Sequence, residues 1–502
     1  MRVEGFLRES LRRFPDKIAL VAGEVRLTYR EFASRVARLA QELRARGVQR
    51  GDRVVVFQHN CADAAVAIFG VLEAGAVFSP LHPSTKADKL AYVLNHSGAR
   101  AIITEPRLAK VANEAADQAP GVAVRLVTPF PGGEAELQQA LSGIELDLAM
   151  VVYTSGSTGK PKGVTMTHAN IVAAATSITT YLESKSDDVV LSVLPLSFDY
   201  GLYQLLMCVK MGATLVLEKS FTYPAVLLKK LEAENVTGLP LVPTIAAVLL
   251  QLKLTPGMFP KLRYLTNTAA ALPRAHIERL RELFPHAKLF SMYGLTECKR
   301  CTYLPPEQLN IRPESVGIAI PGTEAYVVDE HGRRTAPGQV GELVIRGPHV
   351  MKGYWNDPQA TDKALKPGPF PWEKVLYTGD LFRTDDEGFL YFVGRKDDII
   401  KSRGEKVAPR EVENVLYELP GVREAAVVGV PDRILGMAIK AVVAVDAASG
   451  LNERAVIAHC AARLEEYMVP SQVEFRAELP KSENGKIARR AIAEEQNAEV
   501  VA

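Results

Sequence analysis

The chain has 502 residues, of which 47% are apolar and 24% are charged. This length is too great for one hydrophobic core, so we expect two or more domains, with the composition of an ordinary globular enzyme. Lysine and arginine outnumber aspartate and glutamate by only 60 to 58, a balance that excludes broad attraction to nucleic acid or to an anionic membrane. The longest apolar stretch, residues 238–252, contains Pro240 and Pro243 and is too short to span a bilayer.

The amino terminus and the cysteines indicate the compartment. Residues 1–17 mix arginine with acidic side chains and lack an apolar stretch, so we expect no signal peptide. Five scattered cysteines argue against a disulfide framework and predict a cytoplasmic protein. Cys298 and Cys301 have the spacing of a metal or redox pair. Without a second pair or a nearby histidine, we interpret them as two free thiols.

The first hundred residues alternate between helical and strand patterns. Apolar residues recur at helical spacing over 31–46 and 64–73, whereas 53–57 and 101–104 are typical of strands. A similar alternation resumes over 189–290. Such alternation predicts parallel sheets with helices on their faces.

A strand-like run at 151–154 leads into a segment of glycine and hydroxyl side chains. Its backbone N–H groups and hydroxyls can donate to phosphate oxygens. The spacing of Gly156 and Gly159 is neither that of a Walker A loop nor that of GxGxxG. A flexible turn is the alternative, but the strand before it, its own lysines and the helix that we expect after it favour a phosphate loop. The candidate residues are Thr154, Ser155, Gly156, Ser157, Thr158, Gly159 and Lys160.

A second cluster of chemistry-bearing residues, 293–297, follows the strand-like run 287–291. Tyr293 offers a flat face for a base, Thr296 a hydroxyl for phosphate, and Glu297 a hard carboxylate oxygen suited to Mg²⁺. The alternative is that the Thr-Glu pair only begins a helix. A Gly-rich phosphate loop elsewhere in the chain favours the nucleotide site.

The pattern changes after about residue 315. Short strands at 325–329 and 341–346, separated by Gly/Pro turns, predict a small β-rich unit. Asp380, in a Gly-Asp turn, is suited to accept hydrogen bonds from ribose hydroxyls. A charged stretch at 394–398 precedes a mixed α and β pattern, and we place a hinge there.

The last hundred residues contain two lysine-bearing segments. Residues 401–407 precede a predicted helix at 410–416, and residues 479–487 read Leu-Pro-Lys-Ser-Glu-Asn-Gly-Lys-Ile. A lysine near the end of a chain is ordinarily a solvated charge. A functional role for Lys486 therefore depends on whether the rest of the chain supports one.

Taken together, these motifs resemble the adenylate-forming superfamily: acyl-CoA synthetases, adenylation enzymes of peptide synthetases, and luciferases. The resemblance runs in order from residues 27–29 to Lys486, nearly the whole chain. It implies a large α/β domain over 1–394, with parallel-rich sheets sandwiched by helices and a small β-barrel-like unit. A small mobile α+β domain over 395–502 would carry the catalytic lysine.

The resemblance also assigns roles. Lys486 is the catalytic residue and Glu297 the Mg²⁺ ligand. Asp397 is the hinge, and Lys401 and Gly404 serve the second half-reaction. The nucleotide-binding residues that it implies, besides the loop at 154–160, are Ala269, Ala270, Tyr293, Gly294, Thr296, Asp380 and Arg395.

The implied reaction joins a carboxylate to the α-phosphate of ATP, with Mg²⁺ as cofactor and pyrophosphate as leaving group. The acyl group then passes to a thiol, either coenzyme A or the phosphopantetheine of a separate carrier protein, because no carrier segment follows Lys486. Alternatives are transfer to a free amine, a non-catalytic nucleotide-binding relative, or a phosphotransferase that forms ADP. We expect a monomer or a homodimer.

The identity of the acid is less well defined. Asp199 occupies the place where amino-acid-activating relatives pair an aspartate with the substrate ammonium, and a partly buried aspartate needs a cation or donors. The alternative is that Asp199 caps a helix over 203–210. The other candidate pocket residues are small or apolar, which predicts a modest carboxylic or amino acid: Leu239, Thr244, Thr268, Ala269 and Gly294.

Overall fold

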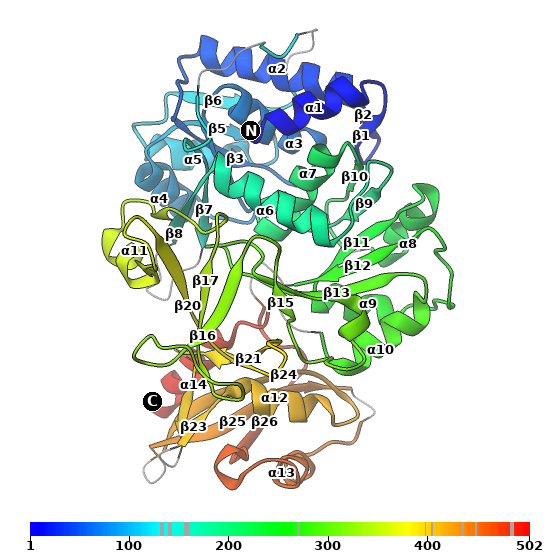
Figure 1. Cartoon of the computed structure of the whole chain (residues 1–502), viewed down its shortest axis with the longest axis vertical. Helices are drawn as coiled ribbons and strands as arrows, with labels where there is room; N and C mark the ends of the chain where they lie inside the picture. The colour runs from blue at the N-terminus through cyan, green and yellow to red at the C-terminus, as the bar shows by residue number, and fades with distance from the viewer. Residues whose placement is uncertain are drawn as a thin grey trace.

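The computed structural model describes residues 1–501 except 131–134, 139–142, 155–160, 222, 269–271, 397, 403–404, 433–435, 447–448 and 482–485. Two large sheets with helices form the amino-terminal part, and a smaller domain ends the chain (Figure 1). The predicted α/β class with a large first and a small last domain is confirmed.

The seven-stranded sheet has a parallel interior and two antiparallel strands at one edge. Its apolar runs form strands because both faces are covered. Its order is β18 (Gly353–Tyr354), β8 (Lys162–Thr167), β7 (Leu148–Thr154), β4 (Val77–Leu81), β3 (Arg53–Phe57), β5 (Ala99–Thr104) and β6 (Val124–Val127).

The nine-stranded sheet is parallel from β1 to β13 and antiparallel at both edges. The parallel strands end on the same side, and ligands of open α/β sheets bind beyond such carboxyl ends. Its order is β15 (Ile318–Ala319), β14 (Thr302–Leu304), β13 (Lys288–Tyr293), β12 (Tyr264–Asn267), β11 (Gly238–Leu241), β9 (Val189–Ser192), β10 (Thr214–Leu217), β1 (Ile18–Ala22) and β2 (Val25–Thr28).

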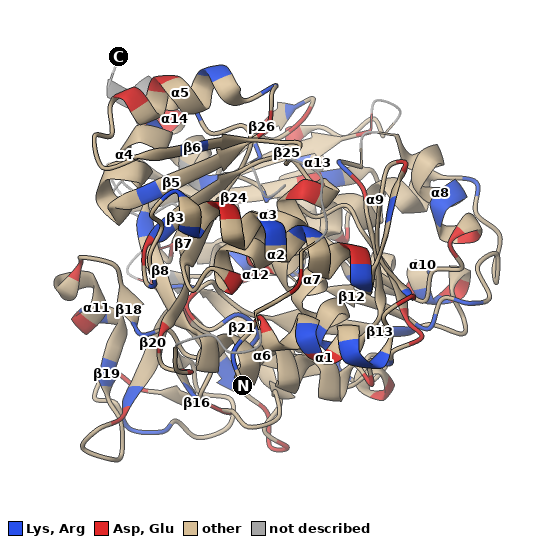
Figure 2. Ribbon diagram, turned by 90° about the horizontal axis from the view of Figure 1, so that it is seen from above, with Lys and Arg blue, Asp and Glu red and all other residues tan. Residues whose placement is uncertain are grey.

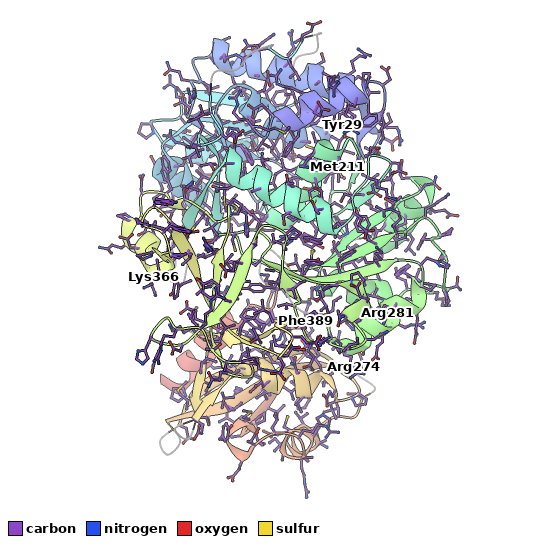
Figure 3. The ribbon with its side chains drawn as sticks, in the orientation of Figure 1. Tyr29, Met211, Arg274, Arg281, Lys366 and Phe389 are labelled. Atoms are coloured by element: carbon purple, nitrogen blue, oxygen red, sulfur yellow. The ribbon has the colours of Figure 1, made fainter. Side chains whose placement is uncertain are left out.

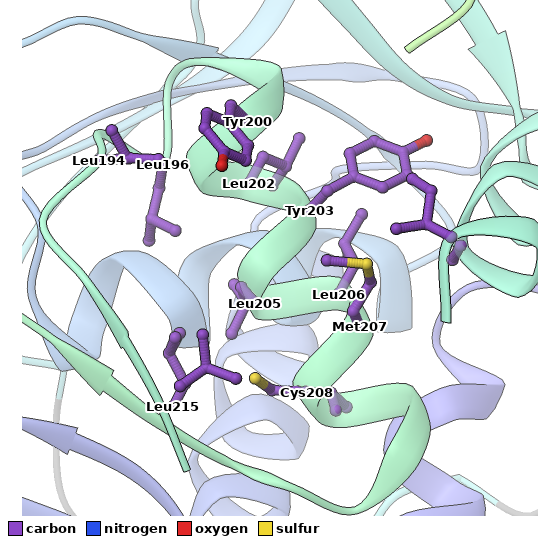
Figure 4. Close-up of a cluster of buried hydrophobic side chains, with 14 of the residues drawn as sticks. Leu194, Leu196, Tyr200, Leu202, Tyr203, Leu205, Leu206, Met207, Cys208 and Leu215 are labelled. Atoms are coloured by element: carbon purple, nitrogen blue, oxygen red, sulfur yellow. The ribbon is translucent and has the colours of Figure 1, made fainter. Parts of the chain in front are cut away.

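Helices cover both sheets, and two of them are buried nearly all round. Helix α3 (Ala62–Glu73) and helix α7 (Asp199–Met211) bury almost every residue, as expected for helices without a polar face. Figure 4 shows the apolar side chains of α7 in this core. The other helices are α1 (Gly5–Arg13), α2 (Tyr29–Ala45), α4 (Ala87–Ser97), α5 (Ala109–Asp117), α6 (His168–Tyr181), α8 (Pro224–Ala233), α9 (Pro243–Gln251) and α10 (Arg274–Leu283).

One hydrogen-bonded contact joins the start of the chain to the end of α7. The Tyr29 hydroxyl donates to the backbone oxygens of Cys208 at 3.2 Å and Ala213 at 2.7 Å. Tyr29 is fully buried, and Figure 3 shows it near Met211. This contact satisfies the phenol in the core and fixes α2 against α7.

The predicted β-rich unit is a five-stranded antiparallel sheet. Strand β20 pairs with three neighbours, so it lies at the centre of the unit. The elements of this part are η1 (Pro306–Gln308), β16 (Glu324–Val328), β17 (Gly341–Arg346), α11 (Pro358–Ala364), β19 (Leu365–Pro367), β20 (Lys374–Thr384) and β21 (Leu390–Arg395).

The carboxyl-terminal domain has an α+β pattern and its own core clusters. A long antiparallel pair, β24 and β25, is covered by helices. The elements are β22 (Ile400–Ser402), β23 (Glu405–Val407), α12 (Pro409–Tyr417), β24 (Val422–Asp432), β25 (Gly436–Val445), α13 (Glu453–Ala461), η2 (Glu466–Met468), β26 (Gln472–Arg476) and α14 (Arg489–Val501).

Three expectations about elements are wrong. Asp380, which we expected in a Gly-Asp turn, lies inside strand β20. A strand, β8, follows the Gly/Ser/Thr segment where we expected a helix, and it runs antiparallel to β7. Its valine and threonines suit a strand, and the helix begins only at α6 behind the Thr167–Asn170 capping box. The helix expected over 203–210 begins at Asp199, so that residue is in the first turn of α7 and makes no side-chain cap.

Charge is mixed over the molecule. Figure 2 shows blue and red segments interspersed, in keeping with the balance of charged residues. Among the helices that the structure describes, none is both long and apolar enough to cross a membrane.

Candidate active site

The site lies at the carboxyl ends of the central parallel strands of both sheets. Strands β7 and β13 end there, at Thr154 and Tyr293. The pairing of Thr154 with Lys162 brings the two ends of the predicted phosphate loop together. Ser155, Gly156, Ser157, Thr158, Gly159 and Lys160, together with Ala269 and Ala270, lie outside the described residues.

Tyr293, Asp380 and Arg395 meet at one point. The Tyr293 hydroxyl donates to Asp380 Oδ2 at 2.5 Å, and Arg395 Nε lies 3.3 Å from Asp380 Oδ1. Asp380 and Arg395 are directly opposite each other on β20 and β21, so the antiparallel register produces the ion pair. The structure thus brings together three residues that are far apart in the sequence.

The charge state of Asp380 depends on these neighbours. Burial raises the pKa of Asp380, and Glu297 acts in the same direction, whereas Arg395, the Tyr293 hydroxyl and Lys486 lower it. A buried carboxylate held by donors on both oxygens is suited to accept hydrogen bonds from ribose hydroxyls.

Glu297 is held in place by two contacts. Its Oε1 accepts a hydrogen bond from the Tyr354 hydroxyl at 2.7 Å, and its backbone oxygen accepts from the Met351 amide at 2.8 Å. Among the described residues, no cluster of three or more potential metal ligands occurs. This donor set fits Mg²⁺, which binds through one or two carboxylates together with substrate phosphates rather than in a protein cage.

Lys486 comes to the same place from the carboxyl-terminal domain. It keeps solvent exposure, yet the surrounding protein and the Arg395 guanidinium lower its pKa, while the Asp380 carboxylate raises it. These mutual effects place the ammonium within electrostatic range of the Tyr293–Asp380–Arg395 cluster. A cation here can interact with the α-phosphate of a nucleotide whose ribose contacts Asp380.

The loop between β13 and β14 folds back on itself. A Cβ on Gly294 would lie 1.8 Å from the backbone oxygen of Lys299, so only glycine fits. The Cys301 amide donates to the Tyr293 oxygen at 2.9 Å and closes the loop. Thr296, Glu297 and the two residues after Cys298 therefore belong to one tight unit.

Asp199 has a cation within the chain. Lys299 Nζ donates to Asp199 Oδ1 at 2.7 Å and to the Thr296 backbone oxygen at 2.9 Å. The Lys299 side chain is fully buried, and its φ of +65° is in the left-handed region. Lys299 thus occupies the position for which we had expected a substrate ammonium, and it is Asp199 that pairs with it.

Sequence reasoning missed Lys299 and Arg300, both buried. It treated them only as the spacer of Cys298 and Cys301. Those two cysteines are free, as predicted, and both are fully buried. The sequence did contain one signal. Two adjacent basic residues stand between the Thr-Glu pair and an apolar strand, a position in which their side chains are expected to be buried.

The remaining pocket candidates differ in position. Thr244 is in the first turn of α9, just beyond the carboxyl end of β11, and Thr268 follows β12. Leu239 is inside β11, two residues before its end, and belongs to the apolar core.

The hinge candidates are only partly described. Asp397 and Gly404 lie outside the described residues, and Lys401 is placed by its backbone pairing with Lys406 in the β22–β23 hairpin. On either side of residue 397, the Lys396 amide donates to the Gly379 oxygen at 2.9 Å and the Asp398 amide to the Arg395 oxygen at 3.0 Å.

Comparison with known proteins decides between the alternatives. The chain matches the AMP-binding enzyme family over residues 7–355 and the AMP-binding enzyme C-terminal domain over residues 411–486. The chain belongs to this adenylate-forming family. It is 32% identical to the long-chain-fatty-acid–CoA ligase of Bacillus subtilis, over 98% of this chain and 94% of that protein. It is 30% identical to a linear gramicidin synthase of Brevibacillus parabrevis, over 96% of this chain and 6% of that protein.

Solved structures of family members include two states of one protein. ATP-bound MatB from Rhodopseudomonas palustris superposes with a TM-score of 0.90 at 28% identity, covering 99% of each chain. Apo MatB gives 0.79 at 27% identity, over 99% of this chain and 100% of that one. The adenylate-forming enzyme described here therefore resembles the ATP-bound form more closely.

Membership in the family establishes the reaction class. The enzyme is an AMP-forming acid ligase that uses ATP and Mg²⁺ to convert a carboxylic acid into an acyl-adenylate and pyrophosphate. It then passes the acyl group to a thiol, coenzyme A or a carrier phosphopantetheine.

Proposed function

We propose that Lys486 stabilises the adenylate-forming step of this ligase, in which a carboxylate oxygen attacks the α-phosphorus of ATP and pyrophosphate leaves. The observation that supports this role is the electrostatic interaction of Lys486 with Asp380 and Arg395. Phosphoryl and adenylyl transfer depend mainly on positioning and charge neutralisation. An ammonium at this point offsets the charge that the attacking carboxylate and the α-phosphate share.

The other residues of the cluster hold the nucleotide. Asp380 would accept hydrogen bonds from the ribose, and Tyr293, fixed through its hydroxyl, would present its ring to the base. Glu297 would hold the Mg²⁺, which neutralises charge on the outer phosphates. The Gly/Ser/Thr segment from Thr154 to Lys160 remains the proposed phosphate loop, with Ala269, Ala270, Gly294 and Thr296 completing the nucleotide site.

The acid is proposed to be a carboxylic acid without an α-ammonium group. Asp199, which an amino-acid substrate would need, already accepts a hydrogen bond from Lys299. An incoming ammonium would have to displace a fully buried lysine from its partner, which leaves a charge without compensation. Thr244 and Thr268 remain proposed contacts of the acid, and Leu239 contributes to the wall behind them.

Coenzyme A is the proposed acceptor, because relatives that match along nearly their whole length are named as CoA ligases. The gramicidin synthase supports a carrier protein as the second candidate. We also propose a cytoplasmic location, supported by the five free cysteines, and a monomer or a homodimer. The residues around Lys401 and Gly404 are proposed to serve the thiol step after rotation about Asp397.

The test of this proposal is an ATP–pyrophosphate exchange assay with a panel of aliphatic, aryl and amino acids. For Lys486→Ala we expect exchange to fall by roughly 10²–10³-fold or more, because a preorganised charge on the transition state is lost. ATP binding, measured by calorimetry, should persist.

Lys481→Ala is the matched control, because Lys481 lies in the same segment but pairs with Glu424 and Glu478 at 2.7 Å. We expect its exchange rate to stay within about fivefold of wild type. Near-normal exchange by Lys486→Ala would refute the role of Lys486. ATP binding by wild type without exchange for any acid would instead favour a non-catalytic relative.

A further inference from the structure

The loop from β13 to β14 buries two consecutive cations, and only one of them has an anionic partner. Lys299 is paired with Asp199. Arg300 is 4% exposed, and its Nε is buried without a hydrogen-bond partner. Among the residues that the structure describes, the Arg300 guanidinium has no carboxylate partner. Its one ring contact is with Tyr200, whose centroid lies 4.6 Å from Cζ.

A buried guanidinium without an anionic partner has an unfavourable desolvation free energy that its surroundings do not fully offset. Removing an ion from water is strongly unfavourable unless a counter-charge or hydrogen bonds replace the solvent. The cation–π contact with Tyr200 offsets a part of this cost. No other described residue supplies the rest, which leaves a place for an anionic group from outside the chain.

Tyr203 is a second buried donor. Its hydroxyl is fully buried and makes no hydrogen bond with the described residues. Burial raises the pKa of Tyr203, the Asp199 carboxylate raises it further and the Arg300 guanidinium lowers it, so the phenol lies within electrostatic range of both charged groups. The Tyr200 hydroxyl is satisfied, because it donates to the Thr266 oxygen at 2.7 Å. Tyr200 and Tyr203 lie on adjoining turns at one end of α7 (Figure 4).

Arg300 belongs to the same loop as Glu297, and the Tyr200 ring that it contacts is hydrogen-bonded to Thr266 near the end of β12. Arg300 follows Glu297 by three residues, so their Cα atoms are at most about 11 Å apart. Gly294 packs directly against the Arg300 backbone. A Cβ added to Gly294 would lie 2.9 Å from the Cα of Arg300. Tyr203 lies one turn after Asp199, near the N-terminus of α7. An acid whose carboxylate meets ATP near Glu297 would extend its other end towards Arg300.

The charges define what that end must be. Lys299 and Asp199 neutralise each other, which leaves the positive charge of Arg300 without compensation. A monocarboxylic acid uses its only charge at the α-phosphate. We infer that the substrate is an acid with a second anionic group, a distal carboxylate, which Arg300 receives as a bidentate partner and to which Tyr203 donates a hydrogen bond. This inference rests on the proposed function of the site.

The experiment compares matched acids in the pyrophosphate exchange assay. Each linear dicarboxylic acid of four to ten carbons is paired with the monocarboxylic acid of the same length and with its own monoamide. We expect wild type to prefer one dicarboxylic acid by at least roughly 10- to 100-fold in kcat/KM over both of its partners, the size of a charged hydrogen bond. Equal turnover of the monocarboxylic acid or the monoamide would overturn the inference.

Two variants locate the preference. In Arg300→Met the ratio of diacid to monoacid kcat/KM should fall by roughly 10- to 100-fold, and Arg300→Lys, which keeps charge without the planar fork, should lie between. Arg274→Met is the control, since Arg274 is an exposed arginine of α10 (Figure 3) paired with Glu278; its ratio should equal that of wild type.

A thermal unfolding assay gives a second readout. Without ligand, Arg300→Met should unfold at the same temperature as wild type or higher, because it removes an ion that has no partner. The diacid should raise the unfolding temperature of wild type and not of the variant. A preference that persists in Arg300→Met overturns the inference alone, whereas absence of exchange with every acid would overturn the proposed function.

Discussion

Asp199 and Lys299 form an ion pair in which each charge depends on the other for neutralisation. Lys299 has no solvent exposure and Asp199 is 12% exposed, so water cannot replace either partner. The free-energy gain from a buried pair is small compared with two apolar groups of the same size, but loss of one partner leaves a bare ion. The N-terminus of α7 adds a favourable dipole for Asp199.

We predict that Asp199→Ala destabilises the amino-terminal domain by about 3–5 kcal/mol, because Lys299 is left as an unpaired buried charge. The double variant Asp199→Leu/Lys299→Met should recover most of that loss. Urea unfolding followed by tryptophan fluorescence measures both. If Asp199→Ala unfolds like wild type and affects only turnover of amino acids, Asp199 is a substrate ligand and the pair is incidental.

The site residues that the sequence revealed are those whose chemistry needs a short local pattern. Tyr293 and Glu297 are near each other in the sequence, and Asp380 is marked by the glycine before it, although the pair lies inside β20 and not in a turn. Arg300 belongs to no recognisable sequence pattern, because its role depends on which side chains surround it. Its burial and the absence of a carboxylate neighbour among the described residues result from three-dimensional packing, and residue spacing in the sequence does not predict them.

At the scale of elements, the strands were predictable where an apolar pattern was bounded by turn-forming or charged residues. Strands β3 and β17 have the expected ends, because glycine turns or charged residues bound an apolar run. Strand β8 was missed because the phosphate-loop analogy suggested a helix. Residues 162–167 alternate in type, which is a strand signal, and Gly163 leaves room for Val151, whose Cγ1 would lie 2.9 Å from a Cβ there.

The connection between β17 and β18 contains a buried histidine that makes stability depend on pH. His349 is 2% exposed, and burial lowers its pKa from 6.5 to about 4 while a contact with the Arg300 backbone acts weakly in the opposite direction. Its Nδ1 lies 3.3 Å from the Thr323 hydroxyl. The folded protein therefore keeps His349 neutral at a pH at which the unfolded chain takes up a proton.

Below pH 6.5 the unfolded state binds the additional proton, so the free energy of unfolding falls as the pH falls from about 6.5 towards 4 and then levels off. The contribution of His349 is up to about 3 kcal/mol. We predict that His349→Asn flattens this part of the pH profile of the unfolding temperature. His331→Asn, on the exposed turn after β16, is the control and should keep the wild-type slope. Parallel profiles for wild type and His349→Asn would contradict the prediction.

At the scale of the molecule, the two domains are built as separate bodies. The large core cluster contains residues up to Leu390, and the clusters of the last domain contain none of its members. The candidate active site nevertheless takes Lys486 from the last domain and Tyr293 and Asp380 from the first, with Arg395 at the boundary between them. The TM-score is higher against ATP-bound MatB than against apo MatB, so the two domains together resemble the ATP-bound form more closely.

For the thiol step we propose a change in the relative orientation of the two domains. Asp397 stands between Lys396 and Asp398, whose amides are both hydrogen-bonded to backbone oxygens around the site. Proline fixes φ near −65°, so Asp397→Pro should hinder rotation about this residue. We expect pyrophosphate exchange to persist while transfer from the adenylate to coenzyme A falls by at least about tenfold, because only the second half-reaction requires the new orientation. Single-turnover assays of each half-reaction measure the two effects separately, and Asp397→Ala, which keeps φ free, should retain both. Equal losses in the two half-reactions would mean that residue 397 supports the site directly and does not act as the hinge.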